Sequence, residues 1–213
     1  MTNIHNLFKF VQSKNPEYRV PFKYKLLYEP DSIEEEDLIV KGDLDLYNTP
    51  ITSLPDNLKV GGYLSLRNTP INSLPDNLQV GGFLNLENTK ITSLPNNLKV
   101  GGSLDLYNTP ITFLPDNLKV KGYLDLRNTK ITSLPDNLKV GEHLYLSNIP
   151  VTSIPNNLKV GGSLDLAYTP ITSLPDNLQV GGHLYLRNTP ISEKYTKRKI
   201  KQMTPGVKGK IYL

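Results

Sequence analysis

Cysteine is absent from the 213 residues of the chain. Disulfides and thiolate chemistry are therefore excluded. No stretch approaches the roughly 18 apolar residues that a membrane-spanning helix needs. The first residues, MTNIHNLFKFVQSKNP, also lack the apolar centre of a secretory signal peptide. We therefore expect a protein of the cytoplasm.

Net charge is missing from most of the chain. Residues 1–40 carry 5 basic and 7 acidic groups, residues 41–191 carry 12 of each, and residues 192–213 carry 7 basic groups and 1 acidic group. The net charge of +4 therefore comes from the C-terminal segment. A neutral middle argues against an extended nucleic-acid-binding surface along it, so nucleic acid is not the expected partner.

A block of 20 residues repeats with few changes from about residue 38 to residue 191. In one copy, Leu64 and Leu66 alternate with other residues, the pattern of a strand with one buried face. Stacked blocks share one core, whereas a single block is too small to fold, so the repeat predicts a solenoid. Four further apolar positions recur in each block, here Ile71, Leu74, Leu78 and Val80. Eight strands are expected to begin near Asp43, Tyr63, Phe83, Ser103, Tyr123, His143, Ser163 and His183.

The other recurring residues of the block are typical of turns and their flanks. Gly61-Gly62 allows a tight entry into the strand. Pro75 has no N–H to donate and suits the extended return path. Asn68-Thr69 is expected to form the turn out of the strand, with the threonine hydroxyl bonding the backbone of that turn.

The segment Leu74–Ser93, LPDNLQVGGFLNLENTKITS, resembles the LPxxLxxLxxLxVxxNxLxx pattern of the 20-residue bacterial leucine-rich repeat. This short class occurs in secreted bacterial effectors, and near-perfect repeats of this kind occur in proteins of bacteria and their phages. The resemblance implies a leucine-rich-repeat solenoid, or horseshoe, with a parallel β-sheet on the concave face, an extended and turn-rich convex side and short helical caps. It also implies a protein-binding scaffold, in the host cytoplasm if the chain is phage-encoded.

The sequence departs from that pattern in two ways. Glycine stands where the third leucine is expected, one place after Val80. Threonine stands where the family usually has asparagine, with Ile149 as the exception. We expect these departures to shift the convex side without changing the fold. The threonines are Thr69, Thr89, Thr109, Thr129, Thr169 and Thr189.

Residues 1–40 are expected to cap the first repeat. Residues 18–29, YRVPFKYKLLYE, alternate like a hairpin around Pro21. Ser32 and Glu35 have the spacing of a capping box, which predicts a helical turn before the first repeat. The apolar residues with helical spacing near the N-terminus are Ile4, Leu7, Phe8 and Val11.

Residues 192–213 are expected to close the other end of a single structural domain whose eight repeats span residues 41–191. VKGKIYL, Val207–Leu213, copies VKGYLDL, Val120–Leu126, and predicts a ninth strand. The intervening SEKYTKRKIKQM predicts a helix with Ser192 as its N-cap. Its basic side chains form either a solvated face or an anion-binding patch: Lys194, Lys197, Arg198, Lys199 and Lys201.

Function is expected on the strand residues that flank the two leucines, because these point away from the core and vary most between blocks. They are rich in tyrosine and arginine, which anchor protein interfaces. The candidate partner-binding residues are Tyr47, Tyr63, Arg67, Phe83, Tyr107, Tyr123, Asp125, Arg127, His143, Tyr145, His183, Tyr185 and Arg187. A purely structural interpretation stays open, because Arg67, Arg127 and Arg187 lie 60 residues apart, as duplication of a three-repeat block predicts.

An enzyme is not expected, and neither is a cofactor or a metal. His143 and His183 share a column but lie two strands apart, ~9.6 Å at strand spacing. That distance is too great for two ligands of one zinc ion. The paired glycines open strands and not helices, so they are not phosphate loops. The column of Asp56 and its equivalents fits ordinary turn chemistry better than calcium binding.

The sequence therefore predicts a non-catalytic protein-binding module, monomeric or weakly homo-oligomeric, that recognises a protein partner on its concave sheet. The resemblance adds the hypothesis of a phage or bacterial inhibitor or adaptor that acts on a host protein. Two alternatives stay open: a structural or self-assembling repeat protein, and nucleic-acid or phosphate binding through the basic C-terminal helix.

Overall fold

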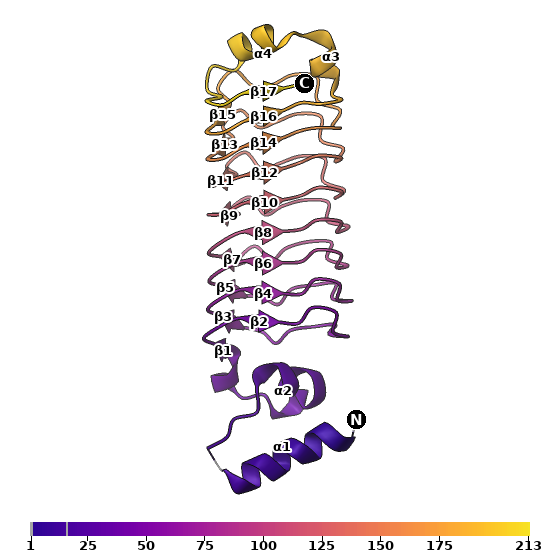
Figure 1. Ribbon diagram of the computed structural model, residues 1–213, viewed down its shortest axis with the longest axis vertical. Helices are drawn as coiled ribbons and strands as arrows, with labels where there is room; N and C mark the ends of the chain where they lie inside the picture. Colours follow the sequence, from indigo (N-terminus) through magenta and orange to yellow (C-terminus); the bar gives the residue numbers. More distant parts are fainter. Residues whose placement is uncertain (1, 16) are drawn as a thin grey trace.

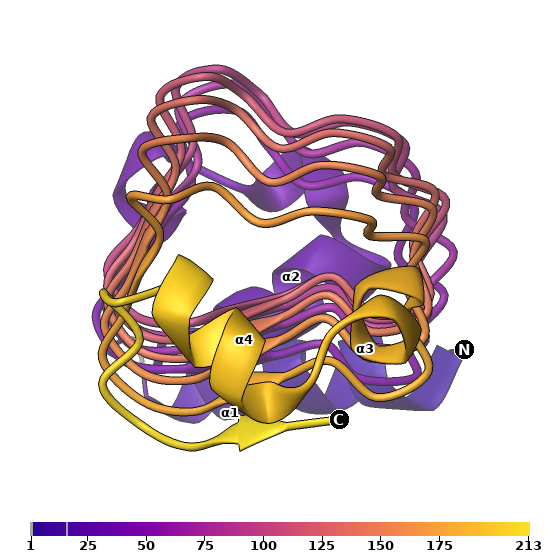
Figure 2. The ribbon, with the colours of Figure 1, turned by 90° about the horizontal axis from the view of Figure 1, so that it is seen from above.

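The chain forms a parallel β-solenoid of 20-residue coils stacked along one axis, with short helices at both ends (Figure 1). The computed structural model describes residues 2–15 and 17–213, and the side chains of residues 6–15 and 17–213. Viewed along the stack, the coils follow similar paths that shift gradually from one end to the other (Figure 2). The predicted solenoid is thus confirmed. A concave curvature of its main sheet stays a prediction.

One nine-stranded parallel sheet runs the length of the stack. Neighbouring strands pair with an offset of 20 residues, as in Leu44↔Leu64 and Leu124↔Leu144. All eight predicted repeat strands are present, and the predicted ninth strand pairs with the last of them. The strands are β2 (Leu44–Asp45), β4 (Leu64–Ser65), β6 (Leu84–Asn85), β8 (Leu104–Asp105), β10 (Leu124–Asp125), β12 (Leu144–Tyr145), β14 (Leu164–Asp165), β16 (Leu184–Tyr185) and β17 (Ile211–Tyr212).

A second side of each coil carries another short strand, and these strands form two four-stranded parallel sheets. The first sheet holds β1 (Ile39–Val40), β3 (Lys59–Val60), β5 (Gln79–Val80) and β7 (Lys99–Val100). The second holds β9 (Lys119–Val120), β11 (Lys139–Val140), β13 (Lys159–Val160) and β15 (Gln179–Val180). Sequence analysis did not predict these strands.

The gap between β7 and β9 coincides with a change in the glycine pair. In other coils the first glycine lies directly against the coil before it: a Cβ added at Gly81 would lie 2.2 Å from the carbonyl oxygen of Gly61. Lys121 takes this position in the coil of β9, and its real Cβ requires the two coils to separate locally. The glycines are therefore needed for close stacking and not for a left-handed backbone, since no glycine of the described chain has a positive φ.

The core is formed by the six apolar positions of the repeat. Leu64, Leu66, Ile71 and Leu78 are fully buried, and Leu74 and Val80 are nearly so. The same positions are buried in almost every coil, and together they form one continuous cluster from Leu26 to Ile211. Each coil therefore buries its leucines against the coils above and below it, as the solenoid prediction requires.

The turn after each strand of the main sheet is built as predicted. The hydroxyl of Thr69 donates to the carbonyl oxygen of Leu66 at 2.6 Å, and equivalent bonds recur along the stack. Asn68 adopts a left-handed conformation with φ of 56°, which asparagine tolerates better than most residues. Tyr168 stands at the equivalent position with φ of 58°.

The N-terminal segment packs two helices and two 3-10 turns below the first coil (Figure 1): α1 (Thr2–Lys14), α2 (Phe22–Tyr28), η1 (Pro30–Ser32) and η2 (Glu35–Leu38). The predicted helix near the N-terminus is present, although the side chain of Ile4 lies outside the described residues. The prediction of a hairpin around Pro21 is wrong, because α2 begins directly after this proline. Proline has no N–H to leave unsatisfied at a helix start, so it suits this position.

The predicted capping box is also displaced. Glu34 and Asp37 form it at the start of η2, where the Asp37 carboxylate accepts from the Glu34 N–H at 3.0 Å. The hydroxyl of Ser32 instead donates to the carbonyl oxygen of Glu29. Both pairs have the same spacing, so the start of the helical turn decides between them: η2 begins at Glu35, which makes Glu34 its N-cap and Asp37 its third residue.

The C-terminal segment forms two short helices that lie over the last coil (Figure 2): α3 (Pro190–Lys194) and α4 (Lys197–Met203). A single helix capped by Ser192 was predicted, and that is wrong. Thr189 caps α3 and Thr196 caps α4, each accepting from a backbone N–H through its hydroxyl. The two helices fill the extra length of the last connection, so Leu184 pairs with Ile211 without loss of register.

Candidate functional site

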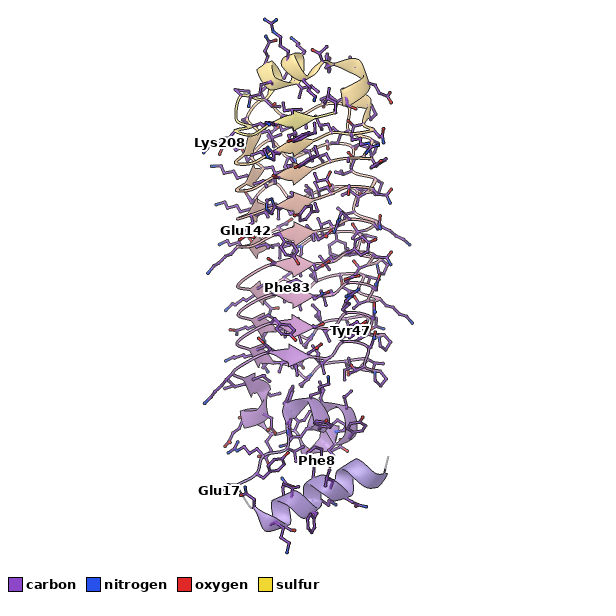
Figure 3. All side chains as sticks on the ribbon, viewed as in Figure 1. Phe8, Glu17, Tyr47, Phe83, Glu142 and Lys208 are labelled. Atoms are coloured by element: carbon purple, nitrogen blue, oxygen red, sulfur yellow. The ribbon has the colours of Figure 1, made fainter. Side chains whose placement is uncertain are left out.

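The exposed side of the nine-stranded sheet is called here the sheet face. It consists of three columns of side chains that begin at Asp43, Asp45 and Tyr47 and advance by 20 residues in each coil. Figure 3 shows Phe83 over the sheet and Tyr47 toward one edge. The structure places all the candidate partner-binding residues on this face, since their strands pair in register.

Several polar side chains of the first column bond to the backbone of the next coil. His143 Nδ1 accepts from the N–H of Ser163 at 2.9 Å, and His183 Nδ1 accepts from the N–H of Lys210 at 3.0 Å. The hydroxyl of Ser103 accepts from the N–H of Tyr123 in the same way. Both histidines therefore have a structural role that the sequence did not indicate.

Aromatic side chains gather at the middle of the sheet face. The rings of Phe83 and Tyr123 lie 5.7 Å apart, and those of Tyr123 and Tyr145 lie 6.1 Å apart. The guanidinium of Arg127 lies 5.3 Å from the ring centre of Tyr107 and 5.2 Å from that of Tyr145. These five residues are called here the central cluster.

A buried ion pair fixes the arginine of this cluster. Asp125 is 2 % exposed, and its carboxylate accepts from Nη2 of Arg127 at 2.5 Å and from Nε at 3.0 Å. Hydrogen bonding to this carboxylate is the main reason why the pKa of Arg127 is raised. The ion pair holds the guanidinium within about 5 Å of two tyrosine ring centres, close enough for cation–π contact.

Asp105 lies beside this ion pair with a carboxylate that has no cation of its own. One of its oxygens accepts from the N–H of Tyr107 at 2.8 Å, and no ion pair involves it in the described part of the chain. Burial, with the nearby charge of Asp125, raises the pKa of Asp105 to about 6. Burial and the two carboxylates raise the pKa of Tyr123 to about 12.

The first coils carry a smaller group. The guanidinium of Arg67 lies 5.5 Å from the ring centre of Tyr47, and its Nε lies 2.9 Å from a carboxylate oxygen of Glu87. This pair is an ionic contact without the alignment of a hydrogen bond, because Nε of Arg67 has no hydrogen-bond partner. The group repeats the Tyr107–Arg127 arrangement, as the 60-residue pattern of the sequence indicated.

The last coils carry a third group, which the sequence analysis missed in part. Tyr212 stacks on Tyr185 with ring centres 4.8 Å apart and an angle of 8°, and His183 lies edge-on to Tyr212 at 5.6 Å. Tyr212 was not among the predicted site residues, although the C-terminal copy of VKGYLDL aligns it with Asp125 and so with the column of Tyr185. Tyr63 and Arg187 have no ring or ion-pair contact in the described chain.

The structure divides the predicted C-terminal basic patch. Lys197, Arg198 and Lys201 line a hollow of about 450 Å³ together with Lys210 and Tyr212, which were not predicted there. Lys201 also donates to the carbonyl oxygen of Val207, so it has a structural role. Lys194 instead lies over the ring of Tyr195, and Lys199 does not line the hollow.

Comparison with known proteins adds little. No protein-family model matches the chain, and neither does any curated protein. Among solved structures, the LRR protein LIC12759 of Leptospira interrogans is similar at 24% identity with a TM-score of 0.48. The match covers 83% of this chain and 57% of that protein, so the chain spans less than two thirds of its length.

The repeat geometry is seen within the chain itself. Its 20-residue period and parallel in-register coils are consistent with the bacterial leucine-rich-repeat pattern quoted from the sequence. Across the described residues, no helix is long and apolar enough to cross a membrane.

Proposed function

We propose that the chain is a non-catalytic protein-binding module that contacts its partner through the sheet face, with the central cluster as the anchor. The observation that carries this proposal is the central cluster itself. It combines four half-buried rings with an arginine that an ion pair already holds in place. Tyrosine and arginine dominate the energetics of protein interfaces.

The size and rigidity of the face support the same function. Eight strand intervals at ~4.8 Å give a face about 38 Å long, which suits an interface of roughly 800 Å² per partner. Its backbone is hydrogen-bonded from coil to coil, so little conformational entropy is lost on binding. In keeping with the resemblance to phage and bacterial repeat proteins, we propose a host protein as the partner and inhibition or recruitment as the effect.

The test is affinity capture from lysate of a candidate host, followed by identification of the captured protein. The first variant is Tyr107→Ala/Tyr123→Ala/Arg127→Ala. The second is Phe83→Ala/Tyr123→Ala, which leaves the Asp125–Arg127 ion pair intact. Phe113→Ala is the matched control, because this phenylalanine is 56% exposed and lies outside the columns of the sheet face.

Both cluster variants are expected to lose the partner, and Phe113→Ala is expected to keep it. A partner retained by both cluster variants, with circular dichroism showing that they are folded, contradicts the proposal. A partner lost only on neutralising Lys197, Arg198 and Lys199 moves the function to the C-terminal hollow.

A further inference from the structure

A column of lysines follows the second side of the coils, away from the sheet face. Lys119, Lys139 and Lys159 are directly paired on neighbouring strands, ~4.8 Å apart along the stack. Like charges at paired positions repel each other and destabilise a sheet. Lys139 and Lys159 lie on the inner strands β11 and β13, where no open edge needs protection. Lys119 lies on the edge strand β9, where a lysine also protects the open edge. Figure 3 shows Lys208 at the end of this side of the stack.

Two adjoining grooves run along this column. One has a volume of about 790 Å³ and the other of about 660 Å³, and Lys119 and Lys121 line both. They therefore form one continuous feature, called here the lysine groove. Its described lining contains no carboxylate. The lysines that line it are Lys41, Lys59, Lys99, Lys119, Lys121, Lys139, Lys159 and Lys208.

The floor of the lysine groove is made of aliphatic residues and glycines. Valines and the first glycines of the coils, such as Val140 and Gly141, lie between the lysines. Within the described lining there is no aromatic residue and no arginine. The groove therefore lacks both the anchors of protein interfaces and the stacking platforms that hold unpaired bases.

We propose that the lysine groove binds the phosphodiester backbone of a nucleic acid without regard to base sequence. A line of ammonium groups without base-reading side chains provides only the sequence-independent phosphate contacts. A lysine-lined groove that runs along the stack fits a linear polymer, whereas a membrane is a plane that would touch only the lysine tips. The eight strands β1 to β15 on this side are separated by seven intervals, which give a length of about 34 Å, enough for several successive phosphates.

This inference is independent of the protein-binding function and reverses an expectation from the sequence. Net charge summed over residues 41–191 is zero and argued against nucleic acid. The sum mixes two sides of the coil: the lysines line one, while Asp105, Asp125 and Asp165 lie on the sheet face. The segment is neutral, but one of its surfaces is not.

The test is fluorescence anisotropy with a labelled 20-nucleotide oligo-dT and a labelled 20-base-pair duplex of mixed sequence, each in 50 and 200 mM salt. The groove variant is Lys119→Gln/Lys139→Gln/Lys159→Gln. Lys9→Gln/Lys90→Gln/Lys130→Gln removes the same charge from exposed positions outside the groove. A third variant, Lys197→Gln/Arg198→Gln/Lys199→Gln, removes charge from the C-terminal helix. Thermal melting checks that every variant is folded.

The wild type and the two other variants are expected to bind at least one probe, with affinity that falls steeply as salt rises. The groove variant is expected to bind at least tenfold more weakly, with a salt slope reduced by about 2 to 3 for three lost phosphate contacts. Glu142→Gln is expected to tighten binding slightly, because this exposed carboxylate lies on the same side of the stack (Figure 3).

Three results overturn the proposal. One is equal binding by the wild type and the groove variant. Another is loss of binding only in the C-terminal variant. The third is binding to phosphatidylserine vesicles or to polyglutamate when neither nucleic-acid probe binds, which assigns the groove to a different polyanion.

Discussion

Arg127 and Asp125 lie two residues apart on one chain segment, and their side chains form a fork: Nε and Nη2 of the arginine both donate to the carboxylate. The carboxylate is buried, while the guanidinium is partly exposed between two tyrosine rings. Arg127 therefore neutralises the buried charge of Asp125 and places its own cation, partly exposed, beside the two tyrosine rings. The same pair therefore contributes to the stability of the sheet and to the charge presented on its exposed face.

Replacing Arg127 with alanine is expected to destabilise the fold by about 1–2 kcal/mol, because Asp125 is left buried without a counterion. This loss is smaller than the loss expected on breaking a fully buried ion pair, because the arginine side chain is 42% exposed. Urea denaturation at pH 7 measures the effect. Adding Asp125→Asn should recover part of the loss, and a double variant no more stable than Arg127→Ala contradicts the interpretation.

Asp105→Asn is expected to stabilise the protein at pH 7 and to leave it unchanged near pH 4. The pKa of Asp105 is about 6 in the folded protein, above its ordinary value of 3.8. The folded state therefore holds its proton where the unfolded state has lost it. The wild type is penalised as pH rises from about 4 through 6. After a discount for partial exposure, the gain at pH 7 is about 1–2 kcal/mol.

Urea denaturation of the wild type and Asp105→Asn at pH 4, 5.5 and 7 measures this difference. Asp165→Asn is the matched control. Asp165 also accepts from a backbone N–H two residues on, but its strand neighbours are Tyr145 and Tyr185. The interpretation fails if the two variants respond to pH alike.

Tyr168→Asn is expected to raise stability by about 1 kcal/mol, because a tyrosine is held in a left-handed conformation that asparagine adopts at lower cost. The tyrosine is 52% exposed, so little packing is lost. Asparagine side chains at this position also bond to each other along the stack, as Asn108 does to Asn88 at 2.7 Å. Thermal melting is the measurement, and a lower melting temperature would show that Tyr168 contributes more than its strain costs.

Gly81→Ala is expected to cost about 2 kcal/mol, because its new Cβ meets the backbone of the previous coil. Gly42→Ala is the control, since nothing lies within 4 Å of a Cβ there. That change should stay within about 0.5 kcal/mol of the wild type. Similar melting temperatures for the two variants would rule out close coil-to-coil approach as the reason for the glycines.

The repeat made the core and the main sheet predictable, because a 20-residue period fixes which side chains face inward in every coil. Leu64 and its equivalents are all buried as expected. The N-terminal segment has no such internal copy. There the alternation around Pro21 indicated a hairpin, whereas proline is also favoured at a helix start, and the structure has a helix.

The site was predictable in its position but not in its contacts. The exposed columns follow from the period, whereas the fork between Asp125 and Arg127 depends on rotamers that a pattern does not specify. The lysine column was visible in the sequence as NLKV, which becomes NLQV at Gln79 and Gln179, yet the short strands that align it were not predicted. The net charge of a segment does not show how its charges are distributed around a coil.

The offset of 20 residues between paired strands has a genetic consequence. Every coil presents nearly the same upper and lower surface to its neighbours, so a coding block of that length can be gained or lost by unequal recombination without creating a new packing problem. The number of coils can then change while the fold of each coil stays the same. A population of such genes can vary the span of the protein while the helices at both ends stay the same.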